Sequence, residues 1–159
     1  MNRNIVGVSE MKVSNKSGDM LVTYSLGSCL GVTVYDPVVR VGGIIHCMLP
    51  FSRIDMQRAQ KSPAMFVDTG IPALFEKAYG LGAKKDRMVL KVAGASRILD
   101  DEGIFRIGDR NYAALRKILW KNNILIATED IGGTSSRTMS LNIDTGQVII
   151  KYRGGEKEL

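Results

Sequence analysis

The chain has 159 residues, of which 45% are hydrophobic and 24% are charged, and its formal net charge is +6. This length is typical of one domain, so we expect residues 1–159 to form a single domain with its own core. Two cysteines and one histidine are too few for a disulfide framework or for the usual four-ligand zinc site.

The positive charge could attract nucleic acid, an anionic membrane surface or an acidic protein. The basic residues are scattered, however, and no run contains five or more of them. There is no RNA-binding pattern, no zinc-finger spacing and no phosphate-binding loop, so we expect no nucleic-acid partner and no cofactor or metal. No apolar run approaches the roughly 20 residues of a membrane span. Without an N-terminal export signal, we expect a cytoplasmic protein whose thiols stay reduced.

The first half of the chain is rich in strand signals. Residues 5–13 alternate loosely and predict a first strand, the cluster 15–19 predicts a turn, and residues 20–24 predict a second strand that carries Thr23. Residues 30–36 and 41–49 are rich in β-branched residues and are separated by a short segment with a proline. This pattern predicts an antiparallel hairpin. The polar stretch 52–62 predicts a mobile surface loop.

The second half mixes helices and strands. Residues 64–79 have helical spacing, although Pro72 requires either a shorter helix capped by Asp68 or Thr69, or a bend. Asp109 is the expected cap of a helix over 110–121. Strands are expected at 87–93, 124–129, 138–143 and 147–152, and residues 153–159 are expected to be a frayed tail. The pattern indicates an α+β fold, with packed, mostly antiparallel sheets and flanking helices.

The stretch from Thr23 to Leu49, which includes the hairpin, contains both cysteines, Cys29 and Cys47, and the only histidine, His46. Neighbouring residues of a strand point to opposite faces, so His46 and Cys47 are unlikely partners. A turn of two or four residues would place Cys29 on the face of His46, and one such register has Asp36 opposite Val39. A turn of three or five residues would separate the pair.

Each cysteine also has a purely structural interpretation. Cys47 would share its face with large aliphatic residues, which is typical of a buried thiol. Cys29 lies in the segment G-S-C-L-G, where glycines leave the sulfur approachable. A Cys29 nucleophile with His46 as its base therefore competes with the hypothesis that both are ordinary core residues.

Several motifs, taken together, resemble those of the CheD family of chemotaxis proteins, the chemoreceptor glutamine deamidases. They are L-G-S-C at 26–29, Y-D-P at 35–37, G-G-I-I-H-C-M-L-P at 42–50, I-G at 107–108 with Asn111, E-D-I-G-G at 129–133, Arg137 and T-G at 145–146. The resemblance extends from about residue 5 to residue 152. One departure is a single glycine, Gly94, where the family usually has two in succession. Another is the segment 134–136, where family members often carry a basic residue.

The resemblance implies a catalytic triad of Cys29, His46 and Thr23. It also implies a fold similar to the catalytic domain of the cytotoxic necrotizing factor deamidases. The implied substrates are glutamines of chemoreceptor helices and, in some members, glutamyl methyl esters. The implied partner is a CheC-type phosphatase. The alternative is a non-catalytic adaptor that only binds such a phosphatase.

In this interpretation His46 would stabilise the Cys29 thiolate as an ion pair, and Thr23 would orient the imidazole. The backbone N–H of Cys29 and one from Gly27 or Ser28 are the expected oxyanion donors.

Overall fold

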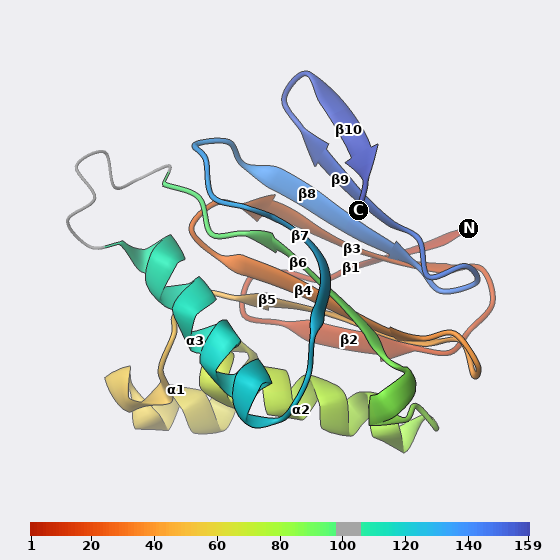
Figure 1. The fold of residues 1–159 in the computed structure, drawn as a ribbon, viewed down its shortest axis with the longest axis horizontal. Helices are drawn as coiled ribbons and strands as arrows, with labels where there is room; N and C mark the ends of the chain where they lie inside the picture. The colour runs from red at the N-terminus through yellow and green to blue at the C-terminus, as the bar shows by residue number, and fades with distance from the viewer. Residues whose placement is uncertain (98–105) are drawn as a thin grey trace.

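The computed structural model describes residues 1–97 and 106–159, and these form two β-sheets packed face to face, with helices on the outer side of one sheet (Figure 1). The first sheet has the order β1-β3-β8-β9-β10 and the second has the order β2-β5-β4-β6-β7. The first sheet is built from β1 (Asn2–Ile5), β3 (Asp19–Leu26), β8 (Arg137–Asn142), β9 (Val148–Tyr152) and β10 (Gly155–Glu158). The second is built from β2 (Met11–Ser14), β4 (Leu30–Asp36), β5 (Val41–Cys47), β6 (Val89–Gly94) and β7 (Ile126–Ile131).

Most strand pairs are antiparallel, and among the described residues only β1–β3 and β6–β7 run parallel. The helices are α1 (Met56–Lys61), α2 (Val67–Gly80) and α3 (Ile107–Lys121). The α+β architecture predicted from the sequence is therefore confirmed. No helix within residues 1–97 and 106–159 has the length and apolar character that a membrane span requires.

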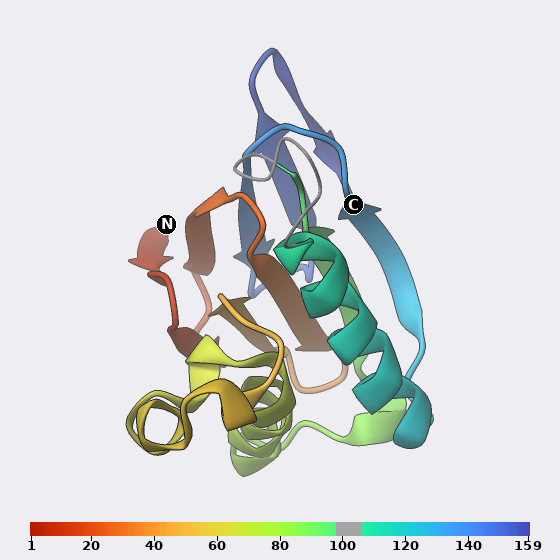
Figure 2. The same cartoon turned by 90° about the vertical axis from the view of Figure 1, so that its left-hand side faces the viewer.

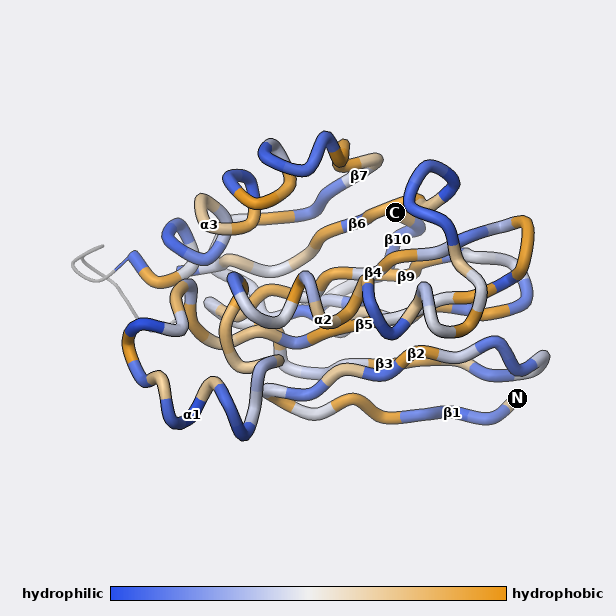
Figure 3. Tube along the Cα trace, turned by 90° about the horizontal axis from the view of Figure 1, so that it is seen from below, coloured by the Kyte–Doolittle hydropathy of each residue, from blue (hydrophilic) through white to orange (hydrophobic). Residues whose placement is uncertain are grey.

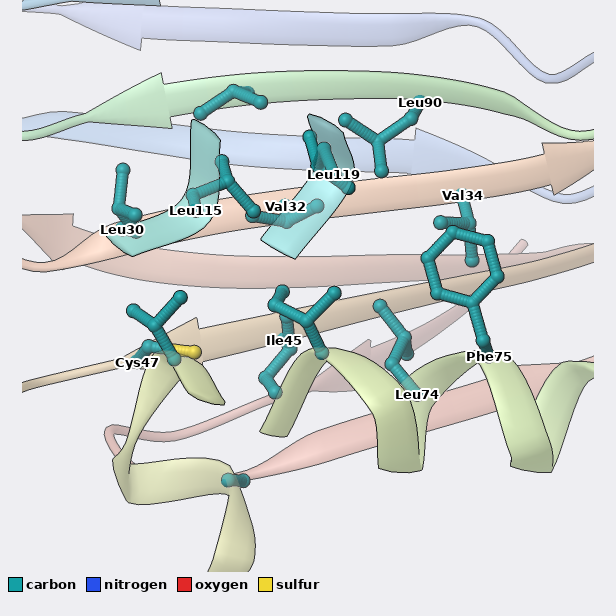
Figure 4. Packing of buried hydrophobic residues seen from close by; sticks show 14 of the residues in the cluster. Leu30, Val32, Val34, Ile45, Cys47, Leu74, Phe75, Leu90, Leu115 and Leu119 are labelled. Atoms are coloured by element: carbon teal, nitrogen blue, oxygen red, sulfur yellow. The ribbon is translucent and has the colours of Figure 1, made fainter. Parts of the chain in front are cut away.

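The central hairpin β4–β5 is covered on both faces, since every residue of its two strands is buried. One face packs against α2 and α3, where Leu74 and Leu115 meet Val32 and Ile45 (Figure 4). The other face packs against the first sheet, where Ile44 meets the side chains of β8 and β9. Figure 3 shows the apolar residues concentrated on these inner strands and on the inward sides of the helices. The hairpin is thus the middle layer between the helices and the first sheet (Figure 2).

Four local predictions were wrong, and each has a physical cause. Residues 5–13 are not one strand, because the chain crosses from β1 in one sheet to β2 in the other. The stretch 52–62 is not a loop but a 3₁₀ turn followed by α1, which Asp55 caps through its bond from the Arg58 N–H at 3.0 Å. The tail 153–159 is not frayed, since β10 pairs with β9. Helix α3 begins three residues before residue 110, and Asp109 lies in its first turn instead of capping it.

Helix α2 includes Pro72 and does not begin near it. The helix is continuous from Val67 and contains Pro72 in its interior. Neither Asp68 nor Thr69 caps it, because its N-cap is Phe66, which makes no side-chain cap bond. The Asp68 carboxylate instead accepts hydrogen bonds from the Ser52 backbone N–H and hydroxyl, both at 2.9 Å. It thereby holds the start of the 52–61 segment against α2.

Candidate active site

The loop Gly27-Ser28-Cys29 carries the chain from β3 in the first sheet to β4 in the second. A bulge in β3 precedes it, since the register with β8 shifts between Thr23 and Leu26 and Ser25 adopts φ +59°. The extra residue allows both Thr23 and Leu26 to point into the protein, where each is fully buried. The bulge therefore aims Thr23 between the sheets and sends the chain across to Cys29.

Thr23 and His46 form a hydrogen-bonded pair across the two sheets. The Thr23 Oγ1 lies 2.7 Å from His46 Nδ1 and 2.7 Å from the carbonyl oxygen of Val6. A carbonyl oxygen only accepts, so the single hydroxyl proton of Thr23 goes to Val6. The hydroxyl oxygen must then accept from a protonated Nδ1 of His46. This assigns the neutral ring its Nδ1–H tautomer and leaves Nε2 with a free lone pair, as a general base requires.

The hairpin register brings Cys29 to the same layer. A four-residue turn joins the strands, as the sequence allowed, but Asp36 pairs with Val41 and not with Val39. His46 consequently lies opposite Gly31 rather than opposite Cys29. Cys29 is half-buried and packs against the inter-sheet core, on the face to which His46 also belongs.

Cys47 lies on the other side of the hairpin. Its side chain is fully buried among residues that face α2 and α3 (Figure 4). Burial raises the pKa of the Cys47 thiol well above its usual range. This placement agrees with the sequence-based assignment of Cys47 as an inert core residue.

The electrostatics of the site differ from the expected ion pair. Burial raises the pKa of the Cys29 thiol, and the N–H of the same residue lowers it by a smaller amount. Burial lowers the pKa of His46 to about 4. The imidazole Nε2 has no hydrogen-bond partner among the described residues. Both groups are therefore neutral in this structure at neutral pH, because the buried setting disfavours either charge.

The loop 27–29, which we call the nucleophile loop after its candidate nucleophile Cys29, is held in place through its backbone carbonyl groups. The oxygens of Gly27, Ser28 and Cys29 accept bonds of 2.9, 3.0 and 2.9 Å. Their donors are the Ser96 N–H, the Asn111 Nδ2 and the Ala95 N–H, in that order. Within residues 1–97 and 106–159, no carbonyl accepts from the N–H groups of the loop. These N–H groups, which have no carbonyl partner in the described part of the chain, are candidate donors to a ligand.

The loop 94–96 supports the nucleophile loop at close range. Gly94 has φ +106°, and a Cβ there would clash with the Cys29 carbonyl. Ala95, the next residue, also adopts a left-handed conformation, with φ +54°. The carbonyl of Gly94 accepts from the buried Arg137 at 3.0 Å, and Arg137 also pairs with Asp130 at 3.4 Å.

The resemblance included Gly94, Asn111 and Arg137 without giving them roles. No spacing or periodicity indicated these roles, because each residue acts on the backbone of a segment distant in sequence.

Among the described residues, no group of three His, Cys, Asp or Glu side chains could hold a metal ion.

Comparison with known proteins supports one family. Residues 48–152 match the family model described as CheD chemotactic sensory transduction. The chain is 54% identical over 151 residues to a probable chemoreceptor glutamine deamidase CheD 1 of Syntrophus aciditrophicus, covering 95% of this chain and 94% of that protein. It is 47% identical over 159 residues to a probable chemoreceptor glutamine deamidase CheD of Solibacter usitatus, covering 100% of this chain and 94% of that protein. A protein of the same description from Archaeoglobus fulgidus is 39% identical over 155 residues, which cover 96% of this chain and 95% of that protein. With this likeness along nearly its whole length, the chain belongs to the CheD family.

Proposed function

We propose that this protein is a glutamine deamidase that converts glutamine side chains of chemoreceptors to glutamate. The names of its relatives support the reaction and the substrate class. One structural observation supports the chemistry. Thr23 holds His46 in the tautomer whose Nε2 is a free base, within the layer against which Cys29 packs. The proposed triad is therefore Cys29 as nucleophile, His46 as base and Thr23 as its orienting group.

The reaction begins with a neutral thiol and a neutral imidazole. As the Cys29 sulfur attacks the carboxamide carbon of the substrate, His46 Nε2 takes the thiol proton. The carbonyl oxygen becomes an oxyanion, for which the N–H of Cys29 and an N–H of Gly27 or Ser28 are the proposed donors. One such donor is typically worth about 3 kcal/mol of barrier.

The second half of the reaction returns the proton. Protonated His46 gives its proton to the amide nitrogen, the C–N bond breaks, and ammonia leaves a thioester on Cys29. A water molecule, deprotonated by the same Nε2, then attacks the thioester carbon. The C–S bond breaks, the sulfur recovers a proton from His46, and the product is glutamate. A glutamyl methyl ester would form the same thioester with methanol as the leaving group, so we propose this as a second activity.

The same proposal covers the setting of the enzyme. It acts as a single cytoplasmic domain, with a CheC-type phosphatase as its protein partner and a fold related to the catalytic domain of cytotoxic necrotizing factor deamidases. A non-catalytic adaptor is the weaker alternative. An adaptor gains nothing from a fully buried histidine whose Nε2 has no partner in the described part of the chain, because such an unsatisfied group costs about 1–3 kcal/mol of stability.

The test compares the two cysteines. Wild-type protein, Cys29→Ala and Cys47→Ala are each incubated with a purified chemoreceptor cytoplasmic fragment, and peptide mass spectrometry counts the glutamines converted to glutamate. We expect conversion to be abolished in Cys29→Ala and largely retained in Cys47→Ala, which is its matched control. Equal losses in both variants would contradict the assignment of Cys29. No conversion by the wild-type protein would contradict the proposed function itself.

A further inference from the structure

Three buried polar atoms of the described residues have no hydrogen-bond partner, and all three belong to residues around the nucleophile loop. They are His46 Nε2, Ser96 Oγ and Asn111 Oδ1. His46 is the proposed base, and the Ser96 backbone already supports the loop. Asn111 has no place in the mechanism described so far, although it is fully buried at the N-terminal end of α3.

Asn111 joins three elements through one amide group. Its Nδ2 donates to the carbonyl oxygens of Ser28 and Met48, both at 3.0 Å. Ser28 precedes the nucleophile, and Met48 follows β5 two residues after His46. Both protons of the Nδ2 group are therefore used, one on each segment. A single side chain of α3 therefore bridges the loop that carries Cys29 and the segment that follows the strand of His46.

The position of Asn111 is itself closely defined. One helical turn earlier, Gly108 packs so closely on the 94–96 loop that a Cβ there would lie 2.7 Å from the carbonyl carbon of Ala95 and 2.8 Å from the carbonyl oxygen of Ser96. The first turn of α3 is thus seated on the same loop whose N–H groups bind the carbonyls of Gly27 and Cys29. Asn111 has little freedom to move relative to the nucleophile loop.

The bond to Ser28 has a directional consequence. The Ser28 carbonyl and the Cys29 N–H belong to one planar trans peptide unit, so they point in opposite directions. A donor that holds the Ser28 oxygen on the α3 side therefore turns the Cys29 N–H away from α3. We infer that Asn111 is a positioning residue, which orients the Cys29 N–H as an oxyanion donor. This inference rests on the proposed deamidase function.

The test separates attack on a carbonyl from reactivity of the thiol. Alkylation of Cys29 by iodoacetamide is a displacement at carbon that needs no oxyanion donor, whereas deamidation does. For Asn111→Ala we expect kcat on the receptor fragment to fall about 100-fold, as for loss of one oxyanion donor. We expect KM and the rate of alkylation to remain within about twofold of the wild-type values, because the site and its thiol stay in place.

Two further variants sharpen the result. Asn111→Asp keeps the size of the side chain but replaces the donor with an acceptor that faces two carbonyl oxygens, so it should show the same selective loss of kcat. Asn122→Ala is the matched control, because the Asn122 Nδ2 donates to the Ile118 carbonyl at the exposed, far end of the same helix. It should keep wild-type kcat.

The outcomes are distinct. If Asn111→Ala deamidates at the wild-type rate, the positioning role is wrong. It is also wrong if alkylation falls in parallel with kcat, or if both Asn111 variants fail to fold, since the contact would then serve stability alone. Wild-type protein that converts no glutamine would refute the proposed function instead, and the alkylation rates would still be measurable.

Discussion

Replacing Thr23 with valine would test the tautomer assignment most directly. Valine has nearly the shape of threonine but no hydroxyl, so Thr23→Val removes two hydrogen bonds without opening a cavity. The Val6 carbonyl loses its donor and His46 Nδ1 loses its acceptor, each from a contact of 2.7 Å. Both groups are in the interior, where water does not replace the hydroxyl.

The magnitude follows from the number of groups left unpaired. An unsatisfied buried polar group costs about 1–3 kcal/mol, so the two groups together lower the free energy of unfolding by about 2–6 kcal/mol. The reactive tautomer also suffers, because its Nδ1–H is then a buried donor without an acceptor. A cost of about 1–3 kcal/mol to that tautomer corresponds to a fall in kcat of about 5-fold to 160-fold.

The assay measures kcat on the receptor fragment and the free energy of unfolding in urea for Thr23→Val and Thr23→Ser. Serine keeps the hydroxyl and loses only a buried methyl group, worth about 1 kcal/mol of stability. We therefore expect Thr23→Ser to keep most of the wild-type kcat and Thr23→Val to lose it. Equal kcat values in the two variants would refute the reasoning, since the hydroxyl would then have no role in preparing His46.

Two further predictions concern the support of the loop and the protonation of the base. Gly94→Ala should lower stability by about 2 kcal/mol or more and abolish most deamidation, because its Cβ meets the Cys29 carbonyl in a left-handed conformation. Gly80→Ala is the control, because a Cβ there would meet nothing within 4 Å, and it should be neutral or slightly stabilising. If Gly94→Ala had wild-type stability in urea, the packing argument would be contradicted. For His46, the folded-state pKa of about 4 lies below the ordinary value of 6.5, so the unfolded chain binds more protons between these two values. The free energy of unfolding should therefore fall as the pH is lowered from about 6.5 to about 4. Urea titrations should show this fall in the wild-type protein, and it should be smaller in His46→Gln, which lacks the imidazole. The same pH dependence in both proteins would show that burial of the imidazole is not its cause.

The sequence predicted those features that depend on strand period alone. His46 and Cys47 are neighbours on one strand, so their assignment to opposite layers required only the alternation of side chains. The exact pairing depended on the turn 37–40, whose length the residues did not determine. The strand β10 was missed because its residues are polar and all exposed, and it pairs only at the edge of a sheet. A frayed tail has the same composition.

The roles of backbone groups were hidden from the sequence for a different reason. Asn111 acts through two carbonyl oxygens that its own segment does not contain, and carbonyl groups carry no residue signature. Thr23 could be placed in the site only by resemblance, because its contact with His46 crosses from one sheet to the other. The way the two sheets face each other follows from packing of the whole core.

The neutral state of His46 fits the harder half of the proposed reaction. The amide nitrogen cannot leave as an anion, so it must gain a proton as the C–N bond breaks. Expulsion of ammonia therefore requires a strong acid at the nitrogen. Burial that lowers the pKa of His46 to about 4 makes its protonated form such an acid. The same burial makes His46 a weak base towards the thiol, which raises the barrier to attack by the sulfur. Another interaction must lower that barrier while the sulfur attacks. The N–H groups of Ser28 and Cys29 can lower it by stabilising the oxyanion. The Ser96 and Asn111 donors hold the carbonyls of the same two peptide units, so they fix the directions of these N–H groups before the substrate arrives. On this argument, the loop and the buried base depend on each other, and loosening the loop should slow attack more than it slows release of ammonia.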